Sequence, residues 1–456
     1  MNLSPAEIAA ALGAEVVAEG TDESPRRATI NSSEAGPGDL FFGLRGEKRD
    51  GGEFAGAAIE AGAWGVVVSP SWRSSLDRDS PPKDERRAWV FVVGDPLTAM
   101  HSLARAYRRA LGAQVVGVTG SVGKTSVKDI AKALMPGKVH ANPQNFNTEI
   151  GLPLTILEAP GDTDVLVLEM AMRGKGQIAE LGAIGEPEVA IVTNVGPVHV
   201  ELLGSVEAIA AAKAEIFDGL PPDGTAVAPV EAGALEPHLE RLSKLLRFGP
   251  GGDVEATEVR VEDGVTAARV RTPLGSERFH FPFTEAHNLT NALAAIAAGV
   301  ALGADLAGMA DRAADIGFSR FRGERLELPG GIVLVNDCYN ANPVSMRAAL
   351  DHLATLDAER SVAVLGEMGE LGPDSSRYHR EVGEHARAAG IDFVIGVGLP
   401  ARDYDPDELV ADPDEAAELL AAQLEPGDAV LVKGSRSAGL EAVAEQLPAL
   451  VEVGDG

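Results

Sequence analysis

Val115-Val-Gly-Val-Thr-Gly-Ser-Val-Gly-Lys-Thr125 decides the fold of this chain, because an apolar run ends there in two glycines followed by Lys-Thr and a helix-like segment. A strand, a glycine-rich turn and a helix are typical of a phosphate-binding loop, whose N–H groups surround phosphate oxygens. The lysine then reaches the β- and γ-phosphates, and the hydroxyl binds Mg²⁺. The strict pattern G-x-x-x-x-G-K-[ST] fails only at its first position, Val118. The alternative is a strand-to-helix turn that merely contains lysine. We predict that a nucleoside triphosphate binds Gly120, Ser121, Val122, Gly123, Lys124, Thr125 and Ser126.

Length and composition restrict the class of protein. A chain of 456 residues, 45% hydrophobic and 24% charged, predicts about three globular domains of ~150 residues each. With 39 Lys and Arg against 69 Asp and Glu, the net charge of −30 argues against nucleic acid as a partner, since phosphate backbones need a basic surface. We therefore expect small-molecule substrates.

The sequence also indicates where the protein works. No apolar run approaches the ~20 residues of a membrane span, and the first residues lack the pattern of a signal peptide. Cys338 is the single cysteine, so no intrachain disulfide can form and a reducing compartment is expected. We expect a cytoplasmic monomer with no membrane partner.

Hydrophobic patterning predicts three α/β domains, at residues 1–112, 113–317 and 318–456. The first is small, with a surface loop at 69–87. The second alternates buried strands with helices, which is typical of a parallel sheet covered on both faces, and carries an antiparallel excursion at 253–283. The third has a Rossmann-like pattern without G-x-G-x-x-G, so no dinucleotide is assigned to it. The expected strands are 39–44, 64–68, 89–93, 165–168, 189–192, 332–335, 361–365, 393–395 and 429–432, and the expected helices are 4–12, 53–63, 98–111, 205–220 and 287–302.

Two potential metal ligands follow neighbouring strands of the second domain. Glu169 comes directly after Val165-Leu-Val-Leu168, and His199 follows the next strand. Ligands of open α/β sheets bind at the carboxyl ends of strands, where a carboxylate can hold the Mg²⁺ of a triphosphate. Read alone, Glu169 is also an ordinary strand-end residue and His199 an ordinary loop residue. Together they indicate a second metal.

Lys213 lies in an alanine-rich helix, Ile209-Ala-Ala-Ala-Lys-Ala-Glu-Ile-Phe217. Spacing alone favours a lysine that extends its charge into water. The alternative is a partly buried amine with a depressed pKa, which can react.

Polar clusters precede two helices. Asn145-Phe-Asn-Thr-Glu149 indicates either a capping turn or contact of Asn145, Asn147 and Glu149 with a substrate or metal. His287 and Asn291 lie four residues apart on one helix face, as a cap or as contacts to a nucleobase.

The third domain contributes basic residues at two places. Arg320, Arg322 and Arg325 stand at its start, where an arginine could close over a triphosphate or form an interdomain salt bridge. After position 400 the basic residues are Arg402, Lys433 and Arg436, and two of them share one Gly/Ser turn. That turn is suited to a carboxylate or phosphate. Cys338 reads as a small buried hydrophobe.

Together these residues resemble the Mur ligases over essentially the whole chain. The motifs that carry the resemblance are Thr119-Gly-Ser-Val-Gly-Lys-Thr125, Asn145-Phe-Asn-Thr-Glu-Ile-Gly151, Asn194-Val-Gly-Pro-Val-His199, Ala212-Lys-Ala-Glu215, His287-Asn-Leu-Thr-Asn291, Asn336-Asp-Cys-Tyr-Asn-Ala-Asn342 and Lys433-Gly-Ser-Arg436. The last two favour members that add D-alanyl-D-alanine to UDP-MurNAc-tripeptide. The Asp-Asn-Pro-Arg motif of the members that add the third residue is absent.

The resemblance implies a mechanism. ATP would phosphorylate the tripeptide carboxylate, and the dipeptide amine would attack the acyl phosphate to give the amide, ADP and phosphate. It implies catalytic roles for Lys124, Glu169, His199 and Lys213, with Lys213 carbamylated by CO₂, and two Mg²⁺ held by Thr125, Glu169, His199 and Lys213. Asn291, Arg325 and Asp337 would contact ATP. Substrate contacts would come from Asn145, Asn147, Glu149, Asn340, Lys433 and Arg436.

Some features depart from the family, and other functions stay open. The first domain of the family commonly shows Asp-Ser-Arg and Asp-Gly-His, where this chain has Asn31-Ser-Ser33 and Asp50-Gly-Gly52. The resemblance makes that domain the UDP-binding one. Alternatives are another Mur-type or folylpolyglutamate-synthetase-like ligase, a nucleotide-driven switch ATPase, and a non-catalytic paralogue.

Overall fold

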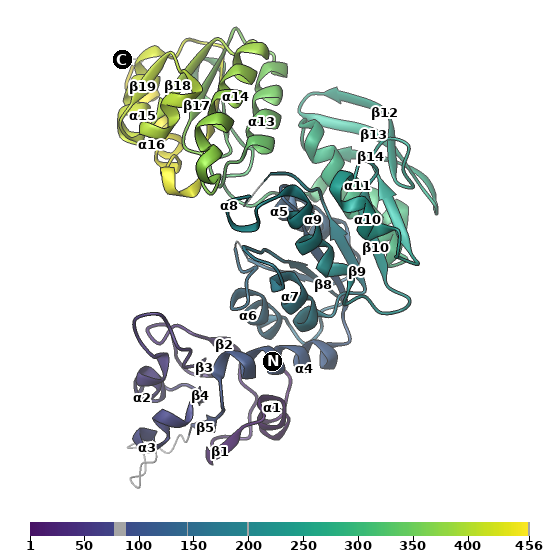
Figure 1. Ribbon diagram of the computed structural model, residues 1–456, viewed down its shortest axis with the longest axis vertical. Helices are drawn as coiled ribbons and strands as arrows, with labels where there is room; N and C mark the ends of the chain where they lie inside the picture. Colours follow the sequence, from purple (N-terminus) through teal and green to yellow (C-terminus); the bar gives the residue numbers. More distant parts are fainter. Residues whose placement is uncertain (77–87, 144, 198–199, 455–456) are drawn as a thin grey trace.

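The computed structural model describes residues 1–76, 88–143, 145–197 and 200–454, which form three α/β domains in a row (Figure 1). The N-terminal domain lies at one end of the long axis and the C-terminal domain at the other. This confirms the expected fold class, while the exact limits 112/113 and 317/318 stay predictions. No helix among the described residues has the length and apolar character needed to cross a bilayer.

The N-terminal domain has a five-stranded sheet in the order β1-β5-β4-β3-β2, parallel except for β1 against β5. Residues 70–76, expected in a loop, instead form a 3₁₀ turn and a short helix, since Pro70 occupies a first helical position and presets the backbone. Residues 77–87 of that predicted loop lie outside the described part. The elements are α1 (Pro5–Leu12), β1 (Glu15–Ala18), β2 (Arg27–Thr29), β3 (Asp39–Phe42), η1 (Gly51–Phe54), α2 (Ala55–Glu60), β4 (Gly65–Val68), η2 (Pro70–Trp72), α3 (Arg73–Leu76), β5 (Trp89–Val92) and α4 (Pro96–Leu111).

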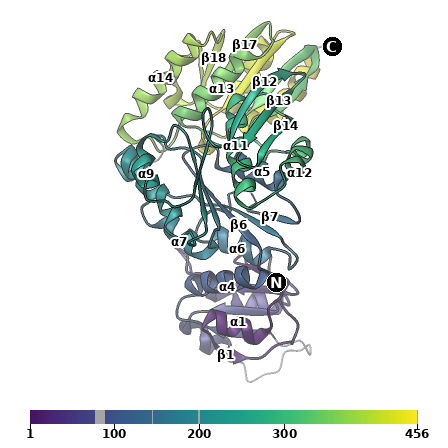
Figure 2. The same ribbon diagram turned by 90° about the vertical axis from the view of Figure 1, so that its right-hand side faces the viewer.

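The central domain is built on a six-stranded parallel sheet in the order β11-β10-β9-β6-β8-β7. Alternate residues of its strands face two separate cores. Val116, Val118 and Ile191 pack with α5 and α11, whereas Leu166, Leu168 and Val192 pack with α6, α7 and α9. Figure 2 shows α7 and α9 on one side of this sheet and α5 on the other. The elements are β6 (Gln114–Thr119), α5 (Lys124–Leu134), β7 (Val139–Ala141), α6 (Gly151–Glu158), β8 (Val165–Glu169), α7 (Gln177–Gly185), β9 (Val189–Val192), α8 (Val200–Leu203), α9 (Val206–Ala214), η3 (Glu215–Phe217), β10 (Thr225–Pro229), η4 (Gly233–Leu235), α10 (Glu236–Leu239), β11 (Leu245–Phe248), α11 (Ala286–Ala301), α12 (Leu306–Arg312) and η5 (Ala313–Asp315).

The predicted antiparallel excursion is a three-stranded sheet of β12 (Glu255–Glu262), β13 (Val265–Thr272) and β14 (Gly275–Phe281). One face of β14 carries Phe279 and Phe281, which stack in series with Phe283 at centroid distances of 5.5 and 5.2 Å. These rings pack into the core that contains α11. The small sheet therefore packs against α11 and α12.

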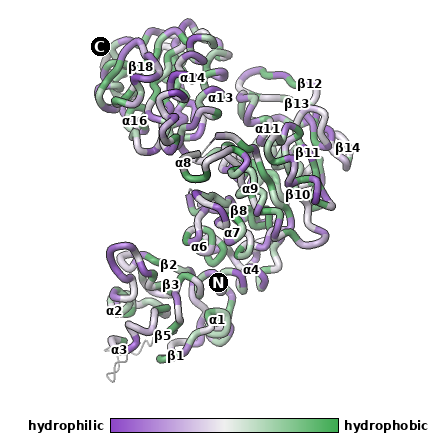
Figure 3. The backbone as a smooth tube through the Cα atoms, in the orientation of Figure 1, coloured by the Kyte–Doolittle hydropathy of each residue, from purple (hydrophilic) through white to green (hydrophobic). Residues whose placement is uncertain are grey.

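The C-terminal domain has a six-stranded sheet in the order β15-β16-β20-β17-β18-β19, parallel except for β15. Its four expected strands are confirmed, and β15 and β19 were not anticipated. Figure 3 shows that the hydrophobic segments of this domain gather inside it. The elements are β15 (Glu324–Leu328), η6 (Pro329–Gly331), β16 (Ile332–Asn336), α13 (Pro343–Thr355), β17 (Arg360–Leu365), η7 (Gly372–Asp374), α14 (Ser375–Ala388), β18 (Phe393–Val397), η8 (Leu399–Tyr404), β19 (Glu408–Val410), α15 (Pro413–Gln423), β20 (Asp428–Lys433), η9 (Arg436–Ala438) and α16 (Glu441–Gly454).

Replacing Phe281 with alanine should lower the free energy of unfolding by about 3 kcal/mol, because the change leaves a cavity between two stacked rings. Leu274, at the turn between β13 and β14, is 58% exposed. Leu274→Ala is the matched control and should change stability by less than about 0.5 kcal/mol. Urea unfolding of the three proteins checks this, and equal effects of the two substitutions would contradict the packing described.

Candidate active site

The phosphate-loop segment runs from the end of β6 to the start of α5 and needs its two glycines. Gly120 has φ of +155° and Gly123 has φ of +81°. A Cβ on Gly120 would overlap the Thr193 side chain, and one on Gly123 would lie 2.5 Å from Asn291 Oδ1. The loop therefore keeps its backbone open at the N-terminus of an eleven-residue helix, where anions bind favourably.

Lys124 lies against this loop. Its ammonium group donates to the carbonyl oxygens of Gly120 at 2.9 Å and Ser121 at 3.4 Å. Burial lowers the pKa of Lys124, and the charge of Arg322 lowers it further, while Glu169 acts in the opposite direction. A lysine held by carbonyl groups at the mouth of a phosphate loop is placed to exchange those contacts for phosphate oxygens.

Glu169 ends β8 beside the loop, as its sequence position predicted. Its Oε2 accepts from the Thr125 hydroxyl at 2.9 Å and its Oε1 accepts from Asn147 Nδ2 at 2.7 Å. The Asn142 carboxamide oxygen accepts from the Glu169 amide at 2.6 Å. Glu169 is only 2% exposed. Its place is thus determined by three side chains of the central domain.

Thr125 and Glu169 fit a magnesium ion. Mg²⁺ prefers oxygen ligands, and in nucleotide enzymes it takes one or two protein ligands together with phosphate oxygens and water. The described residues contain no group of three His, Cys, Asp or Glu side chains able to hold a metal alone. The arrangement therefore suits a metal that arrives with a triphosphate. His199, the predicted ligand of a second metal, lies outside the described residues.

Lys213, near the end of α9, is buried rather than extended into water. It is 2% exposed, and its Nζ donates to the Gly120 carbonyl oxygen at 2.9 Å. Burial, together with the nearby charge of Lys124, holds the pKa of Lys213 well below its usual range. The observed placement favours the second of the two interpretations, a lysine whose neutral amine is available for reaction.

A cavity of about 350 Å³ joins the phosphate loop to the C-terminal domain. From the central domain it is lined by the loop, Glu169 and the first turns of α11 with His287 and Asn291. From the C-terminal domain it is lined by Asp337, Asn340 and Lys433. The structure thus brings together, in one cavity, residues more than 300 positions apart in the chain.

Two predicted substrate contacts at the C-terminal turn have different surroundings. Lys433 is 1% exposed, and its ammonium group contacts Asp337 Oδ2 at 2.6 Å and the Asn340 carbonyl oxygen at 3.1 Å. Arg436 is largely exposed and lies 3.5 Å from Glu441. Lys433 therefore orients Asp337, whereas Arg436 faces solvent.

Other predicted residues lie further from the loop. Asn145 and Glu149 are exposed on the segment before α6, and the Glu149 carbonyl oxygen contacts His101 Nε2 at 2.6 Å. Burial raises the pKa of Cys338 to about 12, so its thiol stays protonated, in agreement with its reading as a hydrophobe. In the N-terminal domain, Asp50 accepts from the Gly52 amide at 2.9 Å, and the Trp72 ring fills the space that a side chain at position 52 would need.

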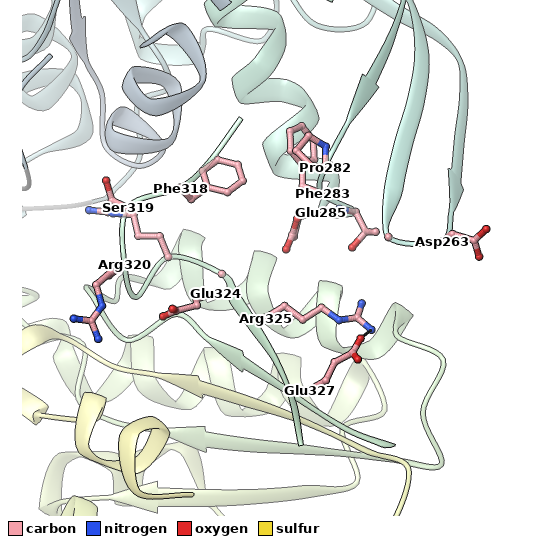
Figure 4. A pocket seen from close by; sticks show the side chains of 14 residues that line it. Asp263, Pro282, Phe283, Glu285, Phe318, Ser319, Arg320, Glu324, Arg325 and Glu327 are labelled. Carbon is pink, nitrogen blue, oxygen red and sulfur yellow. Dashed lines mark hydrogen bonds and ion pairs between the residues drawn. The ribbon is translucent and has the colours of Figure 1, made fainter. Parts of the chain in front are cut away.

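A second cavity, of about 630 Å³, lies between the turn at Asp263, the end of β14 and β15 (Figure 4). Arg325 projects from β15 toward Glu327, 4.0 Å away. Arg320 points in another direction and lies 3.7 Å from Glu445. Of these three arginines Arg322 alone lines both cavities, and among the described residues Glu285 and Gly323 also line both. The sequence could not show that Arg322 reaches the phosphate-loop cavity, since the three arginines lie within six residues of one another.

His379 supports the turn that faces the Lys433–Arg436 segment. It is 1% exposed, and its Nε2 accepts from the Met368 amide at 2.9 Å while Nδ1 contacts the Ser375 carbonyl oxygen at 2.8 Å. Nearby, Gly369 donates to Ser435 Oγ at 2.8 Å. Protonation of Nε2 would therefore break its hydrogen bond with the Met368 amide, and Nδ1 already contacts a carbonyl oxygen. No sequence pattern singled out His379.

Acidification should destabilise the protein through His379. Burial lowers its pKa in the folded state, so below the unfolded value of about 6.5 the unfolded chain binds more protons. Stability from this residue is complete above that pH and falls as the pH drops, by at most about 1.4 kcal/mol per pH unit. Urea unfolding between pH 5 and 7.5 should show a shallower slope for His379→Gln. His280→Gln, at an exposed histidine of β14, should keep the wild-type slope, and an equal slope in all three proteins would refute this role.

Comparisons with known proteins agree with this geometry. Residues 118–299 match the Mur ligase middle domain, 321–436 the Mur ligase glutamate ligase domain, and 27–108 the Mur ligase family catalytic domain. A UDP-N-acetylmuramoyl-tripeptide–D-alanyl-D-alanine ligase of Synechocystis is 38% identical over 90% of this chain and 89% of its own length. The Escherichia coli ligase of the same name is 34% identical, covering 94% and 95%.

Solved structures show the same architecture. A crystal structure of MurF from Acinetobacter baumannii has a TM-score of 0.85 at 27% identity, covering 98% of each chain. MurF ligase of Thermotoga maritima, solved in complex with ADP, has a TM-score of 0.81 at 30% identity, covering 94% of this chain and 98% of that one.

Proposed function

Since the chain belongs to the Mur ligase family, we propose that it joins D-alanyl-D-alanine to UDP-MurNAc-tripeptide in an ATP-dependent reaction. The observation that carries this proposal is the pairing of Thr125 with Glu169 beside Lys124, in a cavity completed by the C-terminal domain. The relatives named above share this acceptor in their names. These names favour D-alanyl-D-alanine over other amino acceptors.

The proposed chemistry overcomes the poor reactivity of a carboxylate. An oxygen of the tripeptide carboxylate bonds to the γ-phosphorus, and the bond to the β–γ bridging oxygen breaks as ADP leaves. The dipeptide amine then attacks the acyl carbon, phosphate leaves with the electrons of the C–O bond, and the proton lost by the nitrogen goes to the phosphate. Lys124 neutralises phosphate charge, and Glu169 holds the Thr125 hydroxyl in place. Magnesium, bound by Thr125 and Glu169, would supply further charge neutralisation, with His199 at a second ion.

The remaining site residues also have proposed roles. Asn291 and Asp337 line the phosphate-loop cavity and are proposed to contact ATP. Arg325, which lines the neighbouring cavity, is proposed to contact ATP as well. Asn147 positions Glu169, and Lys433 orients Asp337. We propose that the peptide substrates contact Asn145, Glu149, Asn340 and Arg436. The N-terminal domain is proposed to bind the UDP group. We propose that the enzyme acts as a cytoplasmic monomer.

A carbamate on Lys213 is the second part of the proposal. Its support is the low pKa of a buried amine that lies beside Lys124. The neutral amine attacks CO₂, forms an N–C bond and releases a proton, which leaves an anionic carbamate in place of the neutral amine. The carbamate anion would be attracted to Lys124 or to a metal ion, whereas a protonated Lys213 would repel Lys124. A nucleotide-driven switch would need no such group.

Incubation with Mg-ATP, UDP-MurNAc-tripeptide and D-alanyl-D-alanine should give UDP-MurNAc-pentapeptide and ADP in equal amounts, detected by mass spectrometry. Lys124→Ala should lower the rate by about 10³-fold or more, since it removes a charge that faces the transferring phosphate. Lys132→Ala, at an exposed lysine of the same helix, should retain the rate. ADP formed without the pentapeptide would refute the ligase and favour a switch.

Labelling with ¹³C-bicarbonate should give a carbamate carbonyl signal in the ¹³C NMR spectrum of the wild-type protein. The signal should persist at alkaline pH and vanish on acidification, because a protonated amine cannot carry CO₂. Lys213→Arg should abolish it. Lys128 is equally buried but lies 3.1 Å from Asp129, so Lys128→Arg should retain it. A wild-type protein without signal would remove the proposed role of Lys213.

A further inference from the structure

A buried ion pair on α5 takes no part in the mechanism described above. Lys128 is 2% exposed and Asp129 is 9% exposed, and Lys128 Nζ lies 3.1 Å from Asp129 Oδ1. Neither is among the described residues that line the phosphate-loop cavity or the neighbouring one. Removing two charges from water costs free energy that their attraction repays only in part, and apolar residues of similar size often stabilise a core as well or better. Fold stability alone therefore does not explain the pair.

Lys128 holds the chain at the end of β7. Its Nζ donates to the Asn142 carbonyl oxygen at 3.1 Å. β7 is an edge strand of three residues, and its pairing with β8 ends at Ala141, opposite Val167. Asn142 therefore lies beyond the last strand pair, where the sheet no longer fixes the backbone. The contact with Lys128 fixes the backbone at that point.

Asn142 in turn holds Glu169, the carboxylate proposed to bind magnesium. Its Oδ1 accepts from the Glu169 amide at 2.6 Å, and its Nδ2 donates to the Glu169 carbonyl oxygen at 3.3 Å. From this backbone position the Glu169 carboxylate accepts from the Thr125 hydroxyl at 2.9 Å. A shift of Asn142 would therefore move the carboxylate relative to the phosphate loop.

Asp129 attaches the same lysine to the C-terminal domain. Its Oδ1 faces Lys128, and its Oδ2 accepts from the Ser319 amide at 2.9 Å and from the Ser319 hydroxyl at 2.8 Å. Ser319 belongs to residues 316–323, the linker between η5 and β15. A continuous path of hydrogen bonds and one ion pair thus runs from this linker through α5 and Asn142 to Glu169.

We propose that Lys128 and Asp129 are positioning residues that set the place of Glu169 for magnesium and tie it to the linker of the C-terminal domain. This rests on the proposed ligase reaction, in which Glu169 binds the metal. Lys128 acts on Asn142 through its hydrogen bond, and Asp129 orients the Lys128 ammonium group while it binds the linker. Loss of a group that orients a metal ligand typically weakens metal affinity by about 10- to 100-fold.

ADP binding with and without Mg²⁺ isolates this role. Calorimetry measures the Kd of ADP in EDTA and in Mg²⁺, and the ratio of the two values reports how much the metal strengthens binding. The double variant Lys128→Met, Asp129→Asn removes the contact with Asn142 without leaving one buried charge alone. The ratio should fall about 10-fold, while the Kd in EDTA should stay within about 2-fold of wild type.

Four single variants accompany this measurement. Lys128→Arg keeps a charged donor and should retain most of the wild-type ratio. Lys132→Met, at an exposed lysine of the same helix, should leave the ratio unchanged. Ser319→Ala removes one linker bond at a half-buried site, so it should fold normally and lower the ratio about 3-fold. Glu169→Gln removes the metal carboxylate and gives the full size of the effect.

Equal weakening of ADP binding in Mg²⁺ and in EDTA would mean that the pair only supports the fold, and would overturn the proposal. An unchanged ratio in the double variant or in Ser319→Ala, beside a reduced ratio in Glu169→Gln, would also overturn it and leave the proposed function standing. An unchanged ratio in Glu169→Gln would overturn the magnesium site together with the positioning role. Because ADP binding needs no peptide substrate, these results do not depend on which amino acceptor the enzyme uses.

Discussion

The carbonyl oxygen of Gly120 accepts hydrogen bonds from two lysines, Lys124 and Lys213, and the active site is built around this contact. Two buried lysine side chains on one carbonyl would be costly if both were charged, and the lowered pKa of Lys213 reflects that cost. The carbonyl dipole offsets part of that cost, and a triphosphate offsets more. Gly120 is required at this position for a separate reason, because a Cβ there would overlap the Thr193 side chain.

The second half of the site depends on the C-terminal domain. Lys433, at the end of β20, donates a hydrogen bond to Asp337 Oδ2 and thereby holds this carboxylate toward the cavity. A hydrogen bond from Ser319 to Asp129 fixes the linker before β15 to α5. The helix that follows the phosphate loop is therefore attached to the start of the C-terminal domain. This geometry gives a physical route by which nucleotide binding and domain position influence each other, since residues of both domains line one cavity.

Local patterns predicted much of this molecule. The β6–loop–α5 unit, the parallel central sheet, the antiparallel excursion and four C-terminal strands follow from periodicities that neighbouring residues express. The adjacency of Glu169 to Thr125 follows from the rule that ligands collect at the carboxyl ends of parallel strands. By contrast, β15 and β19 escaped prediction because short edge strands carry mixed polar residues, and the helical turn at 70–76 was hidden in a polar segment.

What the sequence by itself determined was the class of chemistry: a phosphate loop, a strand-end carboxylate and a reactive-lysine candidate, each readable within about ten residues. Only the tertiary structure decided that Lys213 is buried on Gly120, that Lys433 serves Asp337, and that Arg322 is the arginine of the linker that lines the phosphate-loop cavity. Burial and charge neighbours are properties of long-range packing. A lysine in an alanine-rich helix reads the same whether it faces water or a carbonyl 93 residues away.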